Sequence, residues 1–125
     1  MEIKDVMTPS PHTIGVEQSI SKAEEMMNEF HIRHLPVLHG GKPVGVVSSR
    51  DILLMKAYPE LKPEETTLEE ACSADPYMVA PSEKLSTVCE QMSENKYGCA
   101  LVVEGEKVVG IFSWVDALKV LAKRL

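Results

Sequence analysis

Two versions of one heptapeptide decide the fold of this chain: Gly45-Val46-Val47-Ser48-Ser49-Arg50-Asp51 and Gly110-Ile111-Phe112-Ser113-Trp114-Val115-Asp116. They lie 65 residues apart, and the same offset aligns residues 5–55 with residues 70–120 without a gap. Glycines, serines and aspartates coincide in this alignment, and a shared helix period does not explain such matches. The sequence therefore predicts an internal duplication, which has to be settled before any other reading of the fold.

The length of the chain limits how the two copies can fold. The chain has 125 residues, of which 44% are hydrophobic and 26% are charged, as in ordinary globular proteins. One copy of about 60 residues would bury little surface by itself, so we expect the copies to share one core. The expected boundaries are a first repeat at 1–57, a linker at 58–66 and a second repeat at 67–125.

Charge, cysteines and hydropathy exclude several classes of function. The net charge of −6 and the pI near 5.2 disfavour a nucleic-acid partner. No targeting segment and no run of eighteen apolar residues occurs, so we expect neither secretion nor a membrane partner. Three cysteines without a Cys-x-x-Cys pair fit reduced thiols, and a cytoplasmic location is expected.

Each copy is predicted to run strand, helix, strand, strand, helix, which is a mixed α/β (α+β) pattern. The second and third strands form a hairpin around Gly40 or Gly105. Ser19 is placed to cap the first helix, and the final helices are expected to begin near Ser48 and Ser113. The residues predicted to turn the first helix of each copy toward the core are Ile20, Ala23, Met27 and Phe30, and Leu85, Val88 and Met92.

The segment between the copies is expected to be an exposed linker, because Tyr58 to Glu65 combines two prolines with charged residues. Thr67-Leu68-Glu69-Glu70 has the spacing of a capping box and predicts a brief helix. Ile3 aligns with Leu68 under the 65-residue offset, so the N-terminal residues are expected to play the matching role in the first copy.

The paired heptapeptide places a hydroxyl and a carboxylate at the start of a helix. Backbone N–H groups there favour an anionic or oxygen-rich ligand. The carboxylate of Asp51 or Asp116 can accept two hydrogen bonds from a vicinal diol such as that of a ribose. The alternative is purely structural: Ser48 caps the helix and Asp51 interacts favourably with the helix dipole.

The two copies together resemble a tandem pair of CBS domains, the cystathionine-β-synthase-type repeat that forms a Bateman module. Besides the heptapeptides, three segments carry the resemblance: Val6-Met7-Thr8, His34-Leu35-Pro36-Val37 and Ala100-Leu101-Val102-Val103. The resemblance implies two β-α-β-β-α repeats packed about a pseudo-twofold axis into one compact module. It also implies clefts for AMP, ADP or ATP, with S-adenosylmethionine or NAD less expected, and no required cofactor.

The same resemblance assigns roles to residues of this chain. Asp51 and Asp116 would hold the ribose, and Ser48 and Ser113 the sugar or first phosphate. The stretches Thr13-Ile14 and Met78-Val79 would line the adenine pocket. The remaining candidate ligand-binding residues are Arg33, His34, Pro36, Arg50 and Ala100.

The two halves differ in the cations expected near the ligand. The first copy has Arg33, His34 and Arg50, and the aligned residues of the second copy are Gly98, Cys99 and Val115. An arginine presents a planar fork of donors to a phosphate, which none of the replacements can do. We therefore expect the two sites to have unequal affinities.

Other conspicuous residues fit simpler roles. His31, His34 and His39 lack the carboxylate or thiol that would complete a zinc site. The methionines are expected to fill the core, although Met7 and Met78 could touch adenine. Trp114 either stacks on a base or packs at an interface.

These observations predict a cytoplasmic, non-catalytic sensor of adenosine ligands that responds to cellular energy. By resemblance it would form a homodimer and signal to an unidentified protein effector. One alternative is a ligand-free structural, dimerisation or protein-interaction module. Another is a nucleotide hydrolase, but no triad, paired carboxylates or metal site supports turnover.

Overall fold

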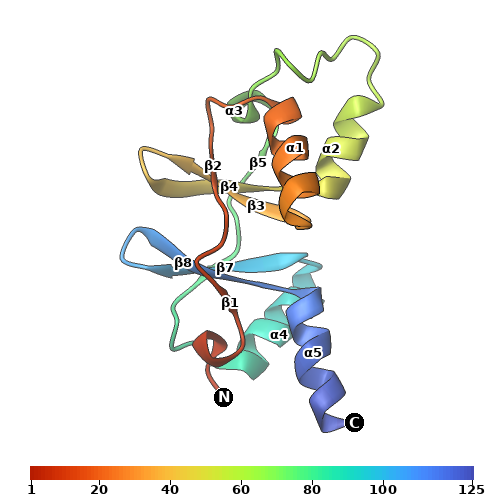
Figure 1. Ribbon diagram of the computed structural model, residues 1–125. Coiled ribbons are helices and arrows are strands. Elements are labelled where there is room, and N and C mark those ends of the chain that lie inside the picture. The colour runs from red at the N-terminus through yellow and green to blue at the C-terminus, as the bar shows by residue number, and fades with distance from the viewer. The chain divides into compact units, whose positions relative to one another are not determined.

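The predicted strand and helix order is present in both copies (Figure 1). The computed structural model describes the backbone of residues 1–125 and every side chain except those of Ser73 and Ala74. The first copy consists of β2 (Ile14–Gly15), α1 (Ile20–Phe30), β3 (His34–His39), β4 (Lys42–Ser48) and α2 (Ser49–Lys56). The second copy consists of β6 (Met78–Val79), α4 (Leu85–Asn95), β7 (Cys99–Glu104), β8 (Lys107–Ser113) and α5 (Trp114–Arg124). The mixed α/β class is confirmed.

Four short elements precede the two copies: η1 (Ile3–Asp5), β1 (Thr8–Pro9), α3 (Leu68–Ala71) and β5 (Ser73–Ala74). The strands β1 and β5 complete the two sheets. One sheet has the strand order β2-β3-β4-β5 and the other the order β1-β8-β7-β6. In each sheet the first strand of the copy runs parallel to the second, and the hairpin and the added strand are antiparallel.

The duplication extends to details of the backbone. The register of the hairpin shifts between Val37 and Leu38 in one sheet and between Val102 and Val103 in the other. The residues that end α1 and α4, His31 and Lys96, are both left-handed, with φ of 55° and 59°. These positions are again 65 residues apart, so the two copies share one backbone design.

The short N-terminal elements belong to the second copy, and the elements after the linker belong to the first. The compact units are Met1–Pro11 with Pro76–Leu125, and His12–Asp75. The expectation that Ile3 serves the first copy is therefore wrong: it is buried with Val88 and Met92 of the second. Local sequence could place the brief helix at Leu68, but it could not tell which sheet each short element would join.

The buried apolar side chains form two clusters, one in each unit, where the sequence led us to expect a single shared core. Leu35, Val37 and Val47 of the first hairpin lie in the first cluster. The second is built mainly from Ala100, Val102 and Phe112 with side chains of α4 and η1. Each sheet therefore presents an apolar face to its own helices.

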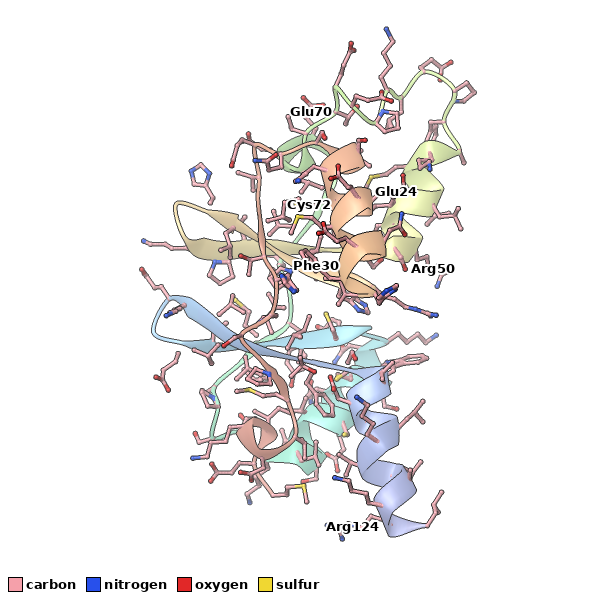
Figure 2. All side chains as sticks on the ribbon, viewed as in Figure 1. Glu24, Phe30, Arg50, Glu70, Cys72 and Arg124 are labelled. Atoms are coloured by element: carbon pink, nitrogen blue, oxygen red, sulfur yellow. The ribbon has the colours of Figure 1, made fainter. Side chains whose placement is uncertain are left out.

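Helix α1 shows how the apolar pattern and a cap define an element. Ser19 Oγ accepts a hydrogen bond from Lys22 N at 3.0 Å, as the sequence predicted. Ile20, Ala23 and Met27 are buried, but Phe30 is 37% exposed and stacks on the ring of His12 instead of entering the core (Figure 2). The capping box predicted at Thr67 is absent, because that side chain makes no cap hydrogen bond, although α3 forms.

Candidate functional site

In the first copy, Ser48 and Asp51 join the end of β4 to the start of α2. Ser48 Oγ accepts a hydrogen bond from Asp51 N at 3.0 Å, and Asp51 Oδ2 accepts one from Ser48 N at 2.9 Å. This reciprocal pair satisfies backbone donors that the helix would otherwise leave open. The structural role expected for Ser48 is thus present, and it uses one oxygen of the Asp51 carboxylate.

His34 stands beside this pair, since it lies opposite Ser48 in the pairing of β3 with β4. Burial lowers the pKa of His34 from 6.5, the Asp51 carboxylate raises it in part, and Arg33 lowers it. The imidazole is consequently uncharged near pH 7, with one nitrogen that donates and one that accepts a hydrogen bond. The carbonyl oxygen of Arg33 accepts a hydrogen bond from Ser49 N at 2.9 Å, which fixes the backbone of Arg33 to the start of α2.

The other first-copy candidates lie at different depths. Thr13 is half-buried, whereas Ile14 and Pro36 are buried, and Ile14 belongs to the first hydrophobic cluster. A ligand could thus meet the backbone of Ile14 more readily than its side chain. Arg50 is exposed at the start of α2, where Figure 2 labels it.

In the second copy, Asp116 is held more tightly than its counterpart Asp51. It is 7% exposed, and its Oδ2 accepts hydrogen bonds from Ser113 N at 2.9 Å and Ser113 Oγ at 3.3 Å. Its Oδ1 accepts a third from Thr8 Oγ1 at 3.0 Å. Thr8 belongs to the Val6-Met7-Thr8 segment, and no local sequence pattern indicates that it reaches Asp116, 108 residues away.

In the second copy, Trp114 and Tyr97 lie next in sequence to Val115 and Gly98, which align with the cations of the first copy. Trp114 is 63% exposed and donates a hydrogen bond from Nε1 to the carbonyl oxygen of Tyr97 at 3.1 Å. The rings of Tyr97 and Tyr77 stack with centroids 4.9 Å apart, and burial is the main cause that raises the pKa of Tyr77. The second copy thus has aromatic side chains beside the positions at which the first copy has Arg33 and Arg50.

The remaining second-copy candidates differ in exposure. Met78 is 47% exposed and Val79 is half-buried. Ala100 is fully buried in the second hydrophobic cluster, so its side chain faces the core.

Comparison with known families settles what kind of repeat this is. The profile of the CBS domain matches residues 3–58 and again residues 68–123. The chain belongs to the CBS-domain family. CBS pairs are in general regulatory, non-catalytic modules.

Solved structures share the fold over the whole chain. The CBS domain pair of protein MJ0100, determined with 5′-methylthioadenosine and S-adenosyl-L-methionine, is 26% identical, with a TM-score of 0.90 over 100% of this chain and 98% of that one. A conserved protein from Pyrococcus horikoshii is 27% identical, with a TM-score of 0.87 over 99% of this chain and 94% of that one. The present chain is therefore similar to complete CBS pairs.

Curated relatives include both small and large proteins. The CBS domain-containing protein YhcV of Bacillus subtilis is 25% identical over 91% of this chain and 81% of its own length. The L-aspartate semialdehyde sulfurtransferase of Methanocaldococcus jannaschii is 31% identical over 91% of this chain. The chain spans about a fifth of that enzyme, and likewise of an inosine-5′-monophosphate dehydrogenase from Korarchaeum cryptofilum.

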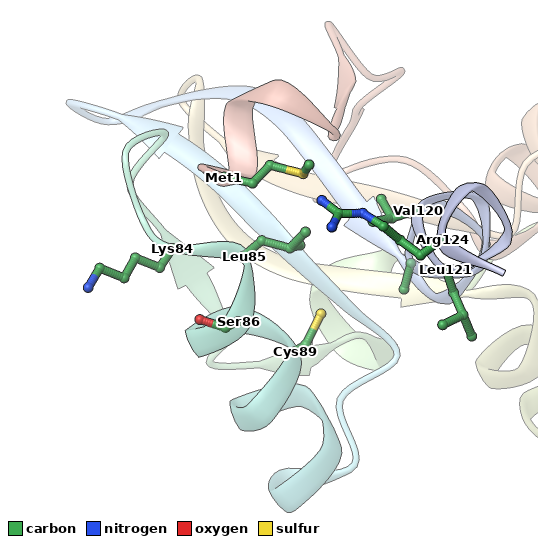
Figure 3. A pocket seen from close by; sticks show the side chains of 9 residues that line it. Met1, Lys84, Leu85, Ser86, Cys89, Val120, Leu121 and Arg124 are labelled. Atoms are coloured by element: carbon green, nitrogen blue, oxygen red, sulfur yellow. The ribbon is translucent and has the colours of Figure 1, made fainter.

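A separate hollow of about 520 Å³ lies in the unit that contains the second CBS repeat (Figure 3). Residues of α4 and α5 line it with Met1 and Lys84, and none of the predicted site residues takes part. Among the side chains that the structure describes, no cluster of three or more metal-ligating residues occurs. Within that same part of the chain, no helix is long and apolar enough to cross a membrane.

Proposed function

We propose that this CBS pair is a regulatory, non-catalytic module that binds adenosine-containing ligands of the AMP, ADP or ATP class. The observation that carries the proposal is the Asp51 carboxylate at the start of α2. Its Oδ2 is used by the Ser48 backbone, and its Oδ1 accepts no hydrogen bond from any residue that the structure describes. A ribose diol can bind a carboxylate that is fixed in this way yet still has open acceptor positions.

Charge near Asp51 favours a phosphorylated ligand in the first repeat. Arg33 and the exposed Arg50 can each present two parallel donors to a phosphate. Uncharged His34 can add one further donor, and the first N–H groups of α2 favour an anion. In our proposal, Thr13 and the backbone of Ile14 border the adenine, and Pro36 shapes the wall of the site.

The second repeat is suited to an adenosine compound with less negative charge. Ser113 and Asp116 repeat the ribose-binding pair, and Met78 and Val79 align with Thr13 and Ile14. Ala100 aligns with Leu35, the residue next to Pro36. The exposed ring of Trp114 offers a surface on which a base can stack. Support for the ligand class comes from MJ0100, whose CBS pair was solved with two adenosine derivatives.

Calorimetry tests this function directly. AMP, ADP, ATP, NADH and S-adenosylmethionine are titrated into the chain and into the Asp51→Asn and Asp116→Asn variants. At least one compound should bind below millimolar concentration, and each variant should weaken one binding event by about tenfold or more, the loss expected for hydrogen bonds to a charged group. Ser19→Ala, which removes a helix cap elsewhere, serves as the matched control and should leave binding unchanged.

The capping bonds of Ser48 and Asp51 favour one other candidate, a ligand-free structural or protein-interaction module. In that case none of the adenosine compounds binds, and Asp51→Asn changes only the free energy of unfolding. The proposed homodimer and its protein effector need a separate measurement. Sedimentation equilibrium with and without the best ligand reports whether two chains associate and whether the ligand changes that association.

A further inference from the structure

Among the residues that the structure describes, Asp116 accepts more hydrogen bonds than Asp51. Asp116 is 7% exposed and accepts three hydrogen bonds, two on Oδ2 and one from Thr8 Oγ1 on Oδ1. Half-buried Asp51 accepts one, on Oδ2, from the residues that the structure describes. The chain therefore supplies to Asp116 a hydroxyl group of its own, of the kind that a ribose would bring.

The number of free acceptor positions limits which ligand groups a carboxylate can bind. An ionised carboxylate offers about four acceptor positions, two on each oxygen. The described side chains leave Asp51 enough positions for both hydroxyls of a vicinal diol. Asp116 has about one left, so it cannot accept both hydroxyls of a diol while Thr8 and Ser113 both donate to it. A ligand diol that binds Asp116 with both hydroxyls must displace one of these two, and Thr8 is the one that occupies Oδ1.

Thr8 sits on a short segment, which we call the N-terminal strap (Met7–Ser10). Met7 packs against the second hydrophobic cluster, and the residues after it are held by few hydrogen bonds. Its strand β1 has only two residues and pairs with β8 through Thr8 and Pro9. Beyond it, Ser10 N donates to the carbonyl oxygen of Val109 at 3.0 Å, and Ser10 has a positive φ of 48°. A two-residue strand at the edge of a sheet needs little free energy to separate.

We propose that Thr8 is a built-in competitor for the Asp116 carboxylate, so that a ligand diol binding there displaces the Thr8 hydroxyl and loosens the N-terminal strap from β8. The proposal rests on the proposed function, because it needs a ligand with a diol. It gives binding at Asp116 a structural consequence, since a segment of the chain is released.

The affinity test isolates the second site in an Asp51→Asn background, with adenosine as the diol probe and 2′,3′-dideoxyadenosine as the probe without a diol. Thr8→Val removes the competing hydroxyl at nearly constant volume, and Thr8→Ala is a second variant in case valine crowds β1. Adenosine should bind about tenfold more tightly to either variant, and dideoxyadenosine should bind equally to all. Thr66→Val, which removes the bond from Thr66 Oγ1 to the Lys62 carbonyl oxygen, should change neither affinity.

Hydrogen exchange at the Ser10 amide measures separation of the N-terminal strap from β8, independently of ligand affinity. Saturating adenosine should speed this exchange severalfold in the unaltered chain, and Thr8→Val should show fast exchange before ligand is added. If adenosine binds but Thr8→Val and Thr8→Ala bind it no more tightly, the competitor role of Thr8 is disproved while the proposed function stands. If no adenosine compound binds at either site of the unaltered chain, both proposals fail.

Discussion

Ile3 occupies in the core of the second repeat the position that Leu68 occupies in the core of the first. Both side chains are fully buried. The amide of Ile3 donates to the carbonyl oxygen of Glu83 at 2.8 Å, and the amide of Leu68 donates to that of Gln18 at 2.9 Å, which are again equivalent positions. Each core is thus closed by a residue from the segment that precedes the other repeat.

This exchange predicts that Ile3 contributes to stability as a core residue, although it lies at the third position of the chain. Ile3→Ala and Leu68→Ala should each lower the free energy of unfolding by about 2–5 kcal/mol, because each leaves a cavity. Urea denaturation followed by circular dichroism measures the loss. Leu53→Ala is the control, since Leu53 is 71% exposed and its loss should change the free energy of unfolding by at most about 0.5 kcal/mol. A similarly small effect for Ile3→Ala would contradict the role assigned to it.

Local patterns in the sequence were sufficient to predict the helices and hairpins. They did not predict that the segment before each repeat packs with the other repeat. The hairpins, the Ser19 cap and the helix starts at Ser48 and Ser113 all follow from short-range signals, and the structure has them. Whether a two-residue strand joins one sheet or the other depends on contacts between distant segments. The strands that β1 and β5 join, β8 and β4, are equivalent strands of the two copies. The sequences of β1 and β5 therefore do not show which of the two sheets each one joins.

The candidate site shows the same division between local and distant information. The pairing of Ser48 with Asp51 follows from three-residue spacing at a helix start. The bond from Thr8 to Asp116 spans 108 residues and follows from no local pattern. Burial also separates the candidate residues: Ile14 faces the core, whereas Arg50 is exposed.

Two serine caps separate the structural contribution of a cap from its contribution to a ligand site. Ser19→Ala and Ser48→Ala each remove a hydroxyl that accepts a backbone hydrogen bond at 3.0 Å. Each should lower the free energy of unfolding by about 0.5–2 kcal/mol. Only Ser48→Ala should also weaken the binding of AMP, measured by calorimetry at a temperature where both variants are folded. Equal AMP affinity in the two variants would remove Ser48 from the proposed site.

His34 should make stability depend on pH below neutrality. Its pKa in the folded chain is lowered from 6.5, chiefly by burial, so the unfolded chain binds the proton more readily. The stabilisation is therefore present above pH 6.5 and is lost as the pH falls through the lower pKa of the folded state. His34→Gln should lose less stability than the unaltered chain between pH 7.5 and pH 5, as measured by urea denaturation.

The same histidine reports on Asp51 directly. The Asp51 carboxylate raises the pKa of His34 against the effect of burial, so Asp51→Asn should lower that pKa further. Titration of the imidazole protons by NMR measures both values. Ser19→Ala, which removes a helix cap elsewhere, is the control and should leave the pKa of His34 unchanged. A His34 pKa that rises in Asp51→Asn would contradict the electrostatic role assigned to this carboxylate.

The N-terminal strap packs closely on β8 at Gly110. A Cβ atom at Gly110 would overlap Met7 Sδ and lie 2.9 Å from Met7 Cγ, so Gly110→Ala must displace the Met7 side chain. Because Met7 packs against the second hydrophobic cluster, the expected loss in the free energy of unfolding is about 1–3 kcal/mol. Gly15→Ala is the matched control: its Cβ would meet the carboxylate of exposed Glu17, which can move into solvent at little cost.

A double-mutant cycle shows whether Met7 is the cause. Met7→Ala removes the side chain that the new Cβ would strike, so Gly110→Ala should cost about 1 kcal/mol less in the Met7→Ala background than alone. Urea denaturation of the four chains gives this coupling. Hydrogen exchange at Ser10 adds a second readout, because a displaced Met7 should also speed exchange in the strap. Strictly additive losses, with slow exchange at Ser10, would mean that β8 accommodates the methyl group without moving the strap.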